Sequence, residues 1–172
     1  RISMRPMSLW ESGESAGTGS LGDLFDGAAL SPQDSALDLQ QIAYLICRGG
    51  WPQATLLEGS VALEEARDYC EAIYKTDIHR IDDVRRSSIR TRLLLRSYAR
   101  HQGCAVSYKR LSEDIKENDN QSISYETVSD YVEALRKLFV VEDMPAWNPN
   151  LRSRAVIMTS DTRYFIDPSI AA

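Results

Sequence analysis

The chain has 172 residues, of which 43% are hydrophobic and 26% charged, and its formal net charge at pH 7 is -5. This length and composition are typical of one globular domain, or of one domain with an appendage. The negative charge gives no overall attraction to nucleic acid, and the apolar runs are far shorter than the ~20 residues that a membrane-spanning helix needs, so we expect no membrane association.

The cysteines and histidines give no sign of a disulfide framework or a metal site. Cys47, Cys70 and Cys104 are far apart and form no Cys-x-x-Cys pair, which predicts free thiols, the first two buried in helices. No signal peptide pattern is present, and we expect a cytoplasmic protein. His79 and His101 are too few to indicate a zinc site, so no cofactor is expected within this chain.

Residues 1–30 predict little folded structure of their own. A strand and its exit are expected at 1–11, where apolar residues cluster: Ile2, Met4, Met7, Leu9 and Trp10. Because an isolated strand needs a partner and there is no initiator Met, we expect the chain to be cut from a longer protein. Residues 12–20 are a Gly/Ser-rich linker without P-loop spacing, and residues 21–29 predict a helical turn anchored by Leu24 and Phe25.

Residues 31–84 predict a helical subdomain. The first helix begins near Ser31, with a buried face formed by Leu37, Ile42, Leu45 and Ile46, and ends at Gly49-Gly50. A second helix begins near Ser60, and its apolar stripe comprises Ala62, Ala66, Tyr69, Cys70 and Ile73. A break at 77–83 follows, anchored by Ile78 and Ile81, and Trp51 is expected in the core.

Residues 85–172 predict a winged helix-turn-helix, so the fold class is mainly α with a small β component. A helix at about 87–102 precedes two further helices capped by Ser107 and Ser124 and separated by turn residues at 118–121. The face of the last helix is apolar at Val128, Tyr131, Val132, Leu135, Leu138 and Phe139. Strands are expected at 140–144 and 164–166, with a wing between them that contains Trp147.

Basic residues gather between 80 and 110, and acidic ones lie in neighbouring segments. Two interpretations stand: the arginines pair with the acidic helices, which we favour, or they form a basic patch. The candidate contact residues for nucleic acid or a partner are Arg92, Arg96, Arg100, Lys109 and Arg110 on the helices, with Arg152 and Arg154 on the wing.

Short motifs in a fixed order resemble the C-terminal region, a domain of unknown function, of prokaryotic AAA-family ATP-binding proteins. Residues 4–12 (MRPMSLWES) resemble the last core strand of the ATPase domain and its exit. RGGWP at 48–52, DIHRI at 77–81, TVSDY at 127–131 with Leu135, and YFIDP at 164–168 are similar to later motifs of the family.

The resemblance implies that residues 1–30 are a remnant strand and flexible linker from an upstream ATPase domain. It implies that the parent protein binds ATP and Mg upstream of residue 1 and is an ATPase. This chain lacks the P-loop, so neither a catalytic residue nor a nucleotide-binding residue is carried over to it.

Two functions remain open. A winged helix suggests DNA, but the leading half of its second helix offers Glu126, Asp130 and Glu133, which phosphates repel. We therefore favour a non-catalytic module that contacts its own upstream ATPase domain or a protein partner. The alternative is a nucleic-acid-binding module that uses the arginine-rich helix and the wing.

Overall fold

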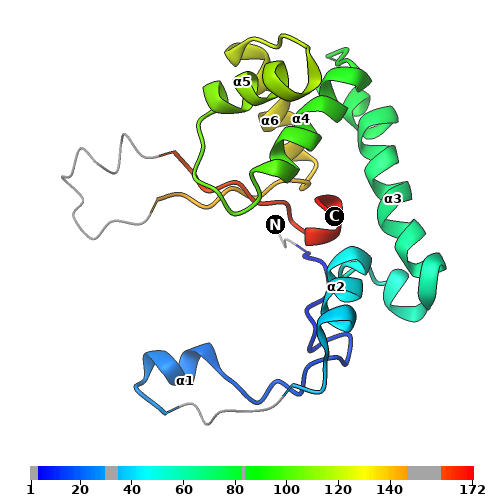
Figure 1. Cartoon of the computed structure of the whole chain (residues 1–172), viewed down its shortest axis with the longest axis vertical. Helices are drawn as coiled ribbons and strands as arrows, with labels where there is room; N and C mark the ends of the chain where they lie inside the picture. Colours follow the sequence, from blue (N-terminus) through cyan, green and yellow to red (C-terminus); the bar gives the residue numbers. More distant parts are fainter. Residues whose placement is uncertain (1–3, 30–34, 83, 147–159) are drawn as a thin grey trace. The chain divides into compact units, whose positions relative to one another are not determined.

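A computed structural model describes residues 4–29, 35–82, 84–146 and 160–172. These residues are mainly helical, with six α-helices among them (Figure 1). The chain divides into two compact units, Arg1–Ala66 and Arg67–Ala172. Among the described residues, no helix combines the length and apolarity that crossing a membrane requires.

The first unit contains α1 (Leu21–Phe25), α2 (Leu39–Arg48), a 3-10 turn η1 (Ala54–Leu56) and the first part of α3 (Gly59–Lys75). Helix α2 begins later than predicted, because Asp38 and Gln41 form a reciprocal capping box in which each side chain accepts the other's backbone N–H. It ends as predicted at Gly49, whose φ of 70° and ψ of -172° favour glycine.

The predicted strand at 1–11 is absent from its described part, residues 4–11, which are extended and then turn from Leu9 onward. No neighbouring strand pairs with these residues; instead the Met7 N–H donates to the Gly50 carbonyl at 2.7 Å. The helical turn at 21–29 is confirmed as α1, but Leu24 and Phe25 do not anchor it, since they are 45% and 86% exposed.

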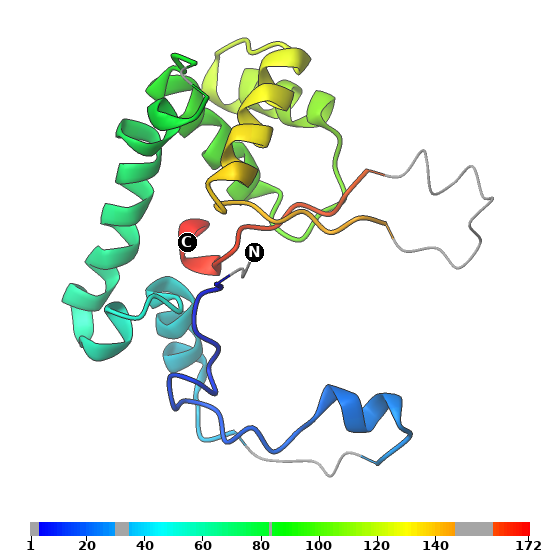
Figure 2. The same ribbon diagram turned by 180° about the vertical axis from the view of Figure 1, so that it is seen from behind.

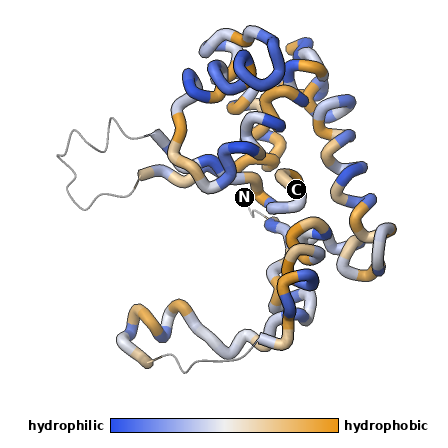
Figure 3. Tube along the Cα trace, viewed as in Figure 1, coloured by the Kyte–Doolittle hydropathy of each residue, from blue (hydrophilic) through white to orange (hydrophobic). Residues whose placement is uncertain are grey.

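The prediction that the apolar face of α2 is buried is wrong. Among its ten residues, all of them described, only Arg48 is buried, while Ile42 and Ile46 are partly exposed and Cys47 is exposed. Figure 3 shows hydrophobic and hydrophilic residues mixed along this helix. The amphipathic pattern is present, but the described residues of the first unit leave much of the apolar side uncovered, with Tyr44 and Leu45 half-buried.

Helix α3 and the turn after it follow the prediction closely. Ala62, Ala66 and Ile73 are buried, and Cys70 is half-buried, its thiol 3.8 Å from the Ile170 carbonyl oxygen. Burial raises the pKa of the Cys70 thiol. The turn η2 (Asp77–Arg80) then buries Ile78.

Three helices form the centre of the second unit: α4 (Ser88–Arg100), α5 (Tyr108–Asp119) and α6 (Tyr125–Lys137). The two predicted serine caps are confirmed, because Ser107 and Ser124 each accept a backbone N–H at the helix start, and Ser87 caps α4 in the same way. The turn after α5 is also confirmed, with Asn120 in the left-handed region. The completely or almost completely buried side chains include Leu94, Tyr98, Leu111, Ile115, Val128, Val132, Leu135 and Val140.

The two strands predicted after α6 are reduced to isolated bridges among the described residues. Residues 140–146 and 160–166 run side by side in both views of the fold (Figures 1 and 2). Val141 pairs with Phe165, and Met144 pairs with Thr162, antiparallel and in one register; Ala105 also bridges to Thr162. The stretch between these bridges covers only four residues on each side, which is near the lower limit for a strand. Part of the predicted wing, including Trp147, lies outside the described residues.

Candidate functional site

The predicted arginines of α4 face acidic residues of α5 rather than standing apart from them. Arg100 Nη2 lies 2.6 Å from Asp114 Oδ2 and 2.9 Å from Asp119 Oδ2, and Arg96 Nη1 lies 2.8 Å from Asp119 Oδ1. Both aspartate side chains are at most 5% exposed. The favoured interpretation is thus confirmed for these two arginines: much of their charge is neutralised within the unit.

The remaining predicted contact residues are dispersed. Lys109 and Arg110 lie near carboxylates of their own helix, at 3.8 Å from Glu113 and 3.1 Å from Glu117 respectively. Arg92 is exposed and has no ion pair within the described part of the chain. Arg152 and Arg154 lie outside the described residues.

The outward side of α6 is acidic, as the sequence predicted. Glu126, Asp130 and Glu133 are all exposed. Asp130 accepts two hydrogen bonds from the buried Arg86, at 2.9 and 3.1 Å, and Glu133 accepts one from Arg136 at 2.5 Å. The first turn of α6, which carries Glu126, therefore presents a carboxylate without a cationic neighbour among the described residues.

A buried charge cluster that the sequence reasoning missed ties the helices to the paired segments. Asp143, whose side chain is 1% exposed, receives hydrogen bonds from three groups: Arg163 at 2.6 Å, Arg136 at 2.7 Å and the Tyr98 hydroxyl at 2.9 Å. Arg163 also donates to the Val106 carbonyl at 2.9 Å, so the carboxylate and the buried guanidinium are both satisfied.

The electrostatic effects in this cluster follow from burial and from the charge pairs. Burial and the neighbouring Asp143 carboxylate raise the pKa of Tyr98, so its hydroxyl stays a donor. The Arg163 guanidinium lies 4.6 Å from the centre of the Tyr108 ring, a cation–π contact. Because each of these charged groups has a partner within the cluster, we interpret the cluster as a structural element that holds the paired segments against the helices. The available sequence signal was an acidic residue, Asp143, inside one predicted strand and a basic residue, Arg163, directly before the other.

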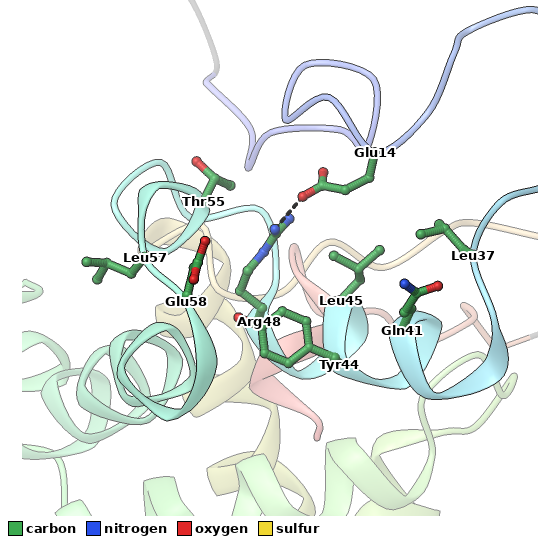
Figure 4. Close-up of a pocket in the computed structure, with 9 residues that line it drawn as sticks. All are labelled: Glu14, Leu37, Gln41, Tyr44, Leu45, Arg48, Thr55, Leu57 and Glu58. Atoms are coloured by element: carbon green, nitrogen blue, oxygen red, sulfur yellow. Dashed lines mark hydrogen bonds and ion pairs between the residues drawn. The ribbon is translucent and has the colours of Figure 1, made fainter.

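A pocket of about 340 Å³ lies in the first unit, beside the end of α2 (Figure 4). Apolar and aromatic side chains form part of its wall, and polar groups form the rest. Its lining residues are Glu14, Leu37, Gln41, Tyr44, Leu45, Arg48, Thr55, Leu57 and Glu58. The volume is at the small end of the range for ligand pockets.

Arg48 is the buried polar group of this pocket, with a side chain only 6% exposed. Its Nε donates to the Gly49 carbonyl at 3.1 Å, and its Nη1 forms an ion pair with Glu14 (Figure 4). The hydrogen bond from Arg48 holds the pKa of Glu14 below its usual value. The sequence reasoning missed this pair; the available signal was an arginine in the last turn of an otherwise uncharged helix.

A family model matches residues 39–172, and the family is described as a domain of unknown function, DUF8612. No curated protein matches the chain, and no solved structure matches it. Among the described residues, no group of three or more His, Cys, Asp or Glu side chains could hold a metal ion.

Proposed function

The chain belongs to DUF8612, a family described only as a domain of unknown function, and we propose that it is a non-catalytic module for contacts with protein. The expected contact is with the chain's own upstream ATPase domain or with a protein partner. The observation that carries this proposal is the internal neutralisation of the α4 arginines by Asp114 and Asp119. A surface meant for phosphates would keep those cations available.

The proposal includes a winged-helix arrangement for residues 85–172. The order of α4, α5 and α6 supports it, as do the antiparallel bridges that follow. Ala105, between α4 and α5, and Met144, after α6, both bridge to Thr162. A winged helix has this order of three helices and returning strands, with one short strand between its first two helices.

The proposed parent is an AAA-family ATP-binding protein, from which this chain would be the C-terminal region. The support is the ordered set of short motifs, to which the Gly49-Gly50 turn contributes a definite geometry. If the natural protein is longer, a P-loop followed by a strand with an acidic end is expected upstream of residue 1. An upstream sequence without a P-loop would contradict the proposed parentage.

The acidic surface of α6 supports protein contact over DNA. In a winged helix the second helix of the pair enters the major groove, leading with its N-terminal residues. Here that first turn presents Glu126, and Asp130 and Glu133 follow on the exposed side. Carboxylates close to phosphates are repelled, by about 4 kcal/mol per pair at 4 Å near a protein surface.

The alternative function, nucleic-acid binding, has one specific observation in its favour. Arg92 is exposed on α4 and has no ion pair among the described residues, and Arg96 is 56% exposed despite its pairing. Together with the basic residues Arg152 and Arg154 outside the described residues, these side chains could contact phosphates.

Titration of labelled duplex DNA at low salt tests the two functions against each other. We expect no binding at micromolar protein, because Arg96 and Arg100 are paired with Asp114 and Asp119 and α6 is acidic. Binding that weakens steeply with salt, and that Arg92→Glu/Arg96→Glu abolishes, would instead establish the alternative. Glu133→Gln is the matched control, since it removes an exposed carboxylate of α6 and leaves both arginines in place.

A further inference from the structure

We propose that Arg48, Gly50 and Thr55, beside the pocket at the end of α2, form an acceptor site for an acidic peptide segment, and that residues 4–15 of this chain bind there in cis, with Glu14 forming part of the pocket wall. The inference goes beyond the proposed function, because it concerns only the first unit. It would stand even if the second unit were found to bind DNA.

The acceptor and the occupant meet at three points. The Met7 N–H donates to the Gly50 carbonyl at 2.7 Å, Thr55 Oγ1 lies 3.7 Å from Met7 Sδ, and Arg48 pairs with Glu14. These are the contacts by which an extended peptide is usually held: a main-chain hydrogen bond, a side-chain contact and a charge-assisted anchor.

Gly50 has no side chain at the point where the peptide backbone passes. A Cβ atom built there would lie 2.1 Å from the Met7 carbonyl oxygen and 2.8 Å from its nitrogen. Only glycine permits so close an approach between the two backbones. Gly49 and Gly50 therefore serve different purposes, one ending the helix and the other admitting the segment.

The occupant carries its own local order, so it behaves as a preformed ligand. Glu11 accepts the backbone N–H of Ser8 at 2.8 Å, and the N–H groups of Glu14 and Ser15 both donate to the Leu9 carbonyl at 2.8 Å. The Ser12 hydroxyl also donates to the Glu14 carboxylate. This turn presents Glu14 to Arg48 with little further loss of conformational freedom.

The division between acceptor and occupant coincides with the limit of the family. Arg48, Gly50 and Thr55 lie within the matched residues 39–172, whereas Met7 and Glu14 lie outside them. In this chain the carboxylate that pairs with Arg48 therefore comes from outside the matched residues.

The pocket chemistry favours a single carboxylate as the group that binds. Glu58 lines the same pocket and has no ion pair among the described residues, so its charge opposes a doubly charged phosphate. The ring of Tyr44 and the side chains of Leu45 and Leu57 offer apolar contact beside the guanidinium. An acidic side chain flanked by apolar residues fits this arrangement.

The test is the binding of a fluorescein-labelled peptide of residues 4–20 to the full chain, followed by anisotropy. Wild type should bind weakly, because the cis segment competes at an effective concentration near millimolar. Glu14→Lys repels Arg48 and frees the site, so this variant should bind the peptide at least about tenfold more tightly. Adding Arg48→Gln to Glu14→Lys should remove that gain.

The peptide provides an arm of the test that does not depend on the folding of an Arg48 variant. A peptide in which Glu14 is replaced by Gln should lose most of its affinity for the Glu14→Lys protein, because the ion pair cannot form. Equal affinity for the two peptides, or no binding of the natural peptide to Glu14→Lys up to about 1 mM, would overturn the proposal.

Discussion

Arg48 in the first unit and Arg163 in the second are both buried and ion-paired, and the two pairs differ in how their carboxylates are held. Asp143, the partner of Arg163, has a 1% exposed side chain and three donors. Glu14, the partner of Arg48, is 21% exposed and comes from a segment 34 residues away in sequence. The Asp143–Arg163 pair joins the paired segments to the helices of the second unit. The Glu14–Arg48 pair attaches residues 4–15 at the end of α2, and we expect these residues to detach without unfolding the rest of the first unit.

The largest expected effect follows from removing the better-held carboxylate. Asp143→Ala leaves the buried Arg163 with only the more exposed Asp161, at 3.9 Å, as a counter-charge and leaves the Tyr98 hydroxyl without its acceptor. The free energy of unfolding should fall by about 3–5 kcal/mol. Urea denaturation followed by circular dichroism measures the change.

Two controls sharpen this comparison. Glu133→Ala removes a 55% exposed partner of Arg136 and should cost less than about 1 kcal/mol. Glu14→Ala should also cost about 1 kcal/mol or less in global stability, because the pocket admits water to Arg48. If Glu14→Ala lowered the free energy of unfolding as much as Asp143→Ala does, the Arg48–Glu14 pair would also be part of the folded core.

The second prediction compares two amphipathic helices, α6 and α2. Leu135 on α6 is completely buried, so Leu135→Ala should lower the free energy of unfolding by about 2–5 kcal/mol. Ile46 on α2 is 44% exposed, so Ile46→Ala should change it by about 0.5 kcal/mol or less.

Thermal unfolding of the two variants under identical conditions measures the difference. If Ile46→Ala were as costly as Leu135→Ala, the apolar side of α2 would be covered in solution. The distinction between the helices would then be lost.

The same two helices show how far the sequence predicted the fold. The positions of α3 to α6, the serine caps and most of the buried face of α6 could be read from local patterns, because capping and periodicity act over a few residues. Phe139 was predicted on that face, but it lies beyond the end of α6 and is 47% exposed. The burial of α2 could not be read in this way, since its pattern specifies an apolar side but not whether any element covers it. Asp38 and Gln41 set the start of α2 through mutual hydrogen bonds, a signal that was available in the sequence but was not used when the start was predicted near Ser31.

The candidate sites were less predictable than the helices. The charge alternation between α4 and α5 correctly indicated that Arg96 and Arg100 find acidic partners. The pairs Arg163–Asp143 and Arg48–Glu14 join residues 20 and 34 positions apart. Such pairs depend on how segments come together in three dimensions, and a single sequence gives charges without that arrangement.

The third and smallest effect is a pH dependence at the interface of α4 and α5. Burial alone would raise the pKa of Asp114, but hydrogen bonds from Arg100 and Ser97 and the charge of Arg100 outweigh it and hold the pKa below its usual value. A carboxyl group with a lowered pKa in the folded state stabilises the fold above its unfolded pKa of about 4. That contribution is lost as the pH falls through the folded-state value.

Asp114→Asn should therefore be less stable than wild type at pH 7, and the difference should shrink as the pH falls below about 4. Urea midpoints measured for both proteins from pH 7 to about pH 2 follow this convergence, and a difference independent of pH would contradict it.

The pKa of Glu14 is also held below its usual value, by Arg48, so acid should weaken the Arg48–Glu14 ion pair as well. Because Glu14 is the only carboxylate that pairs with Arg48 among the described residues, the protection of the Met7 amide from hydrogen exchange, corrected for the intrinsic pH dependence of exchange, should fall at acid pH before the second unit unfolds.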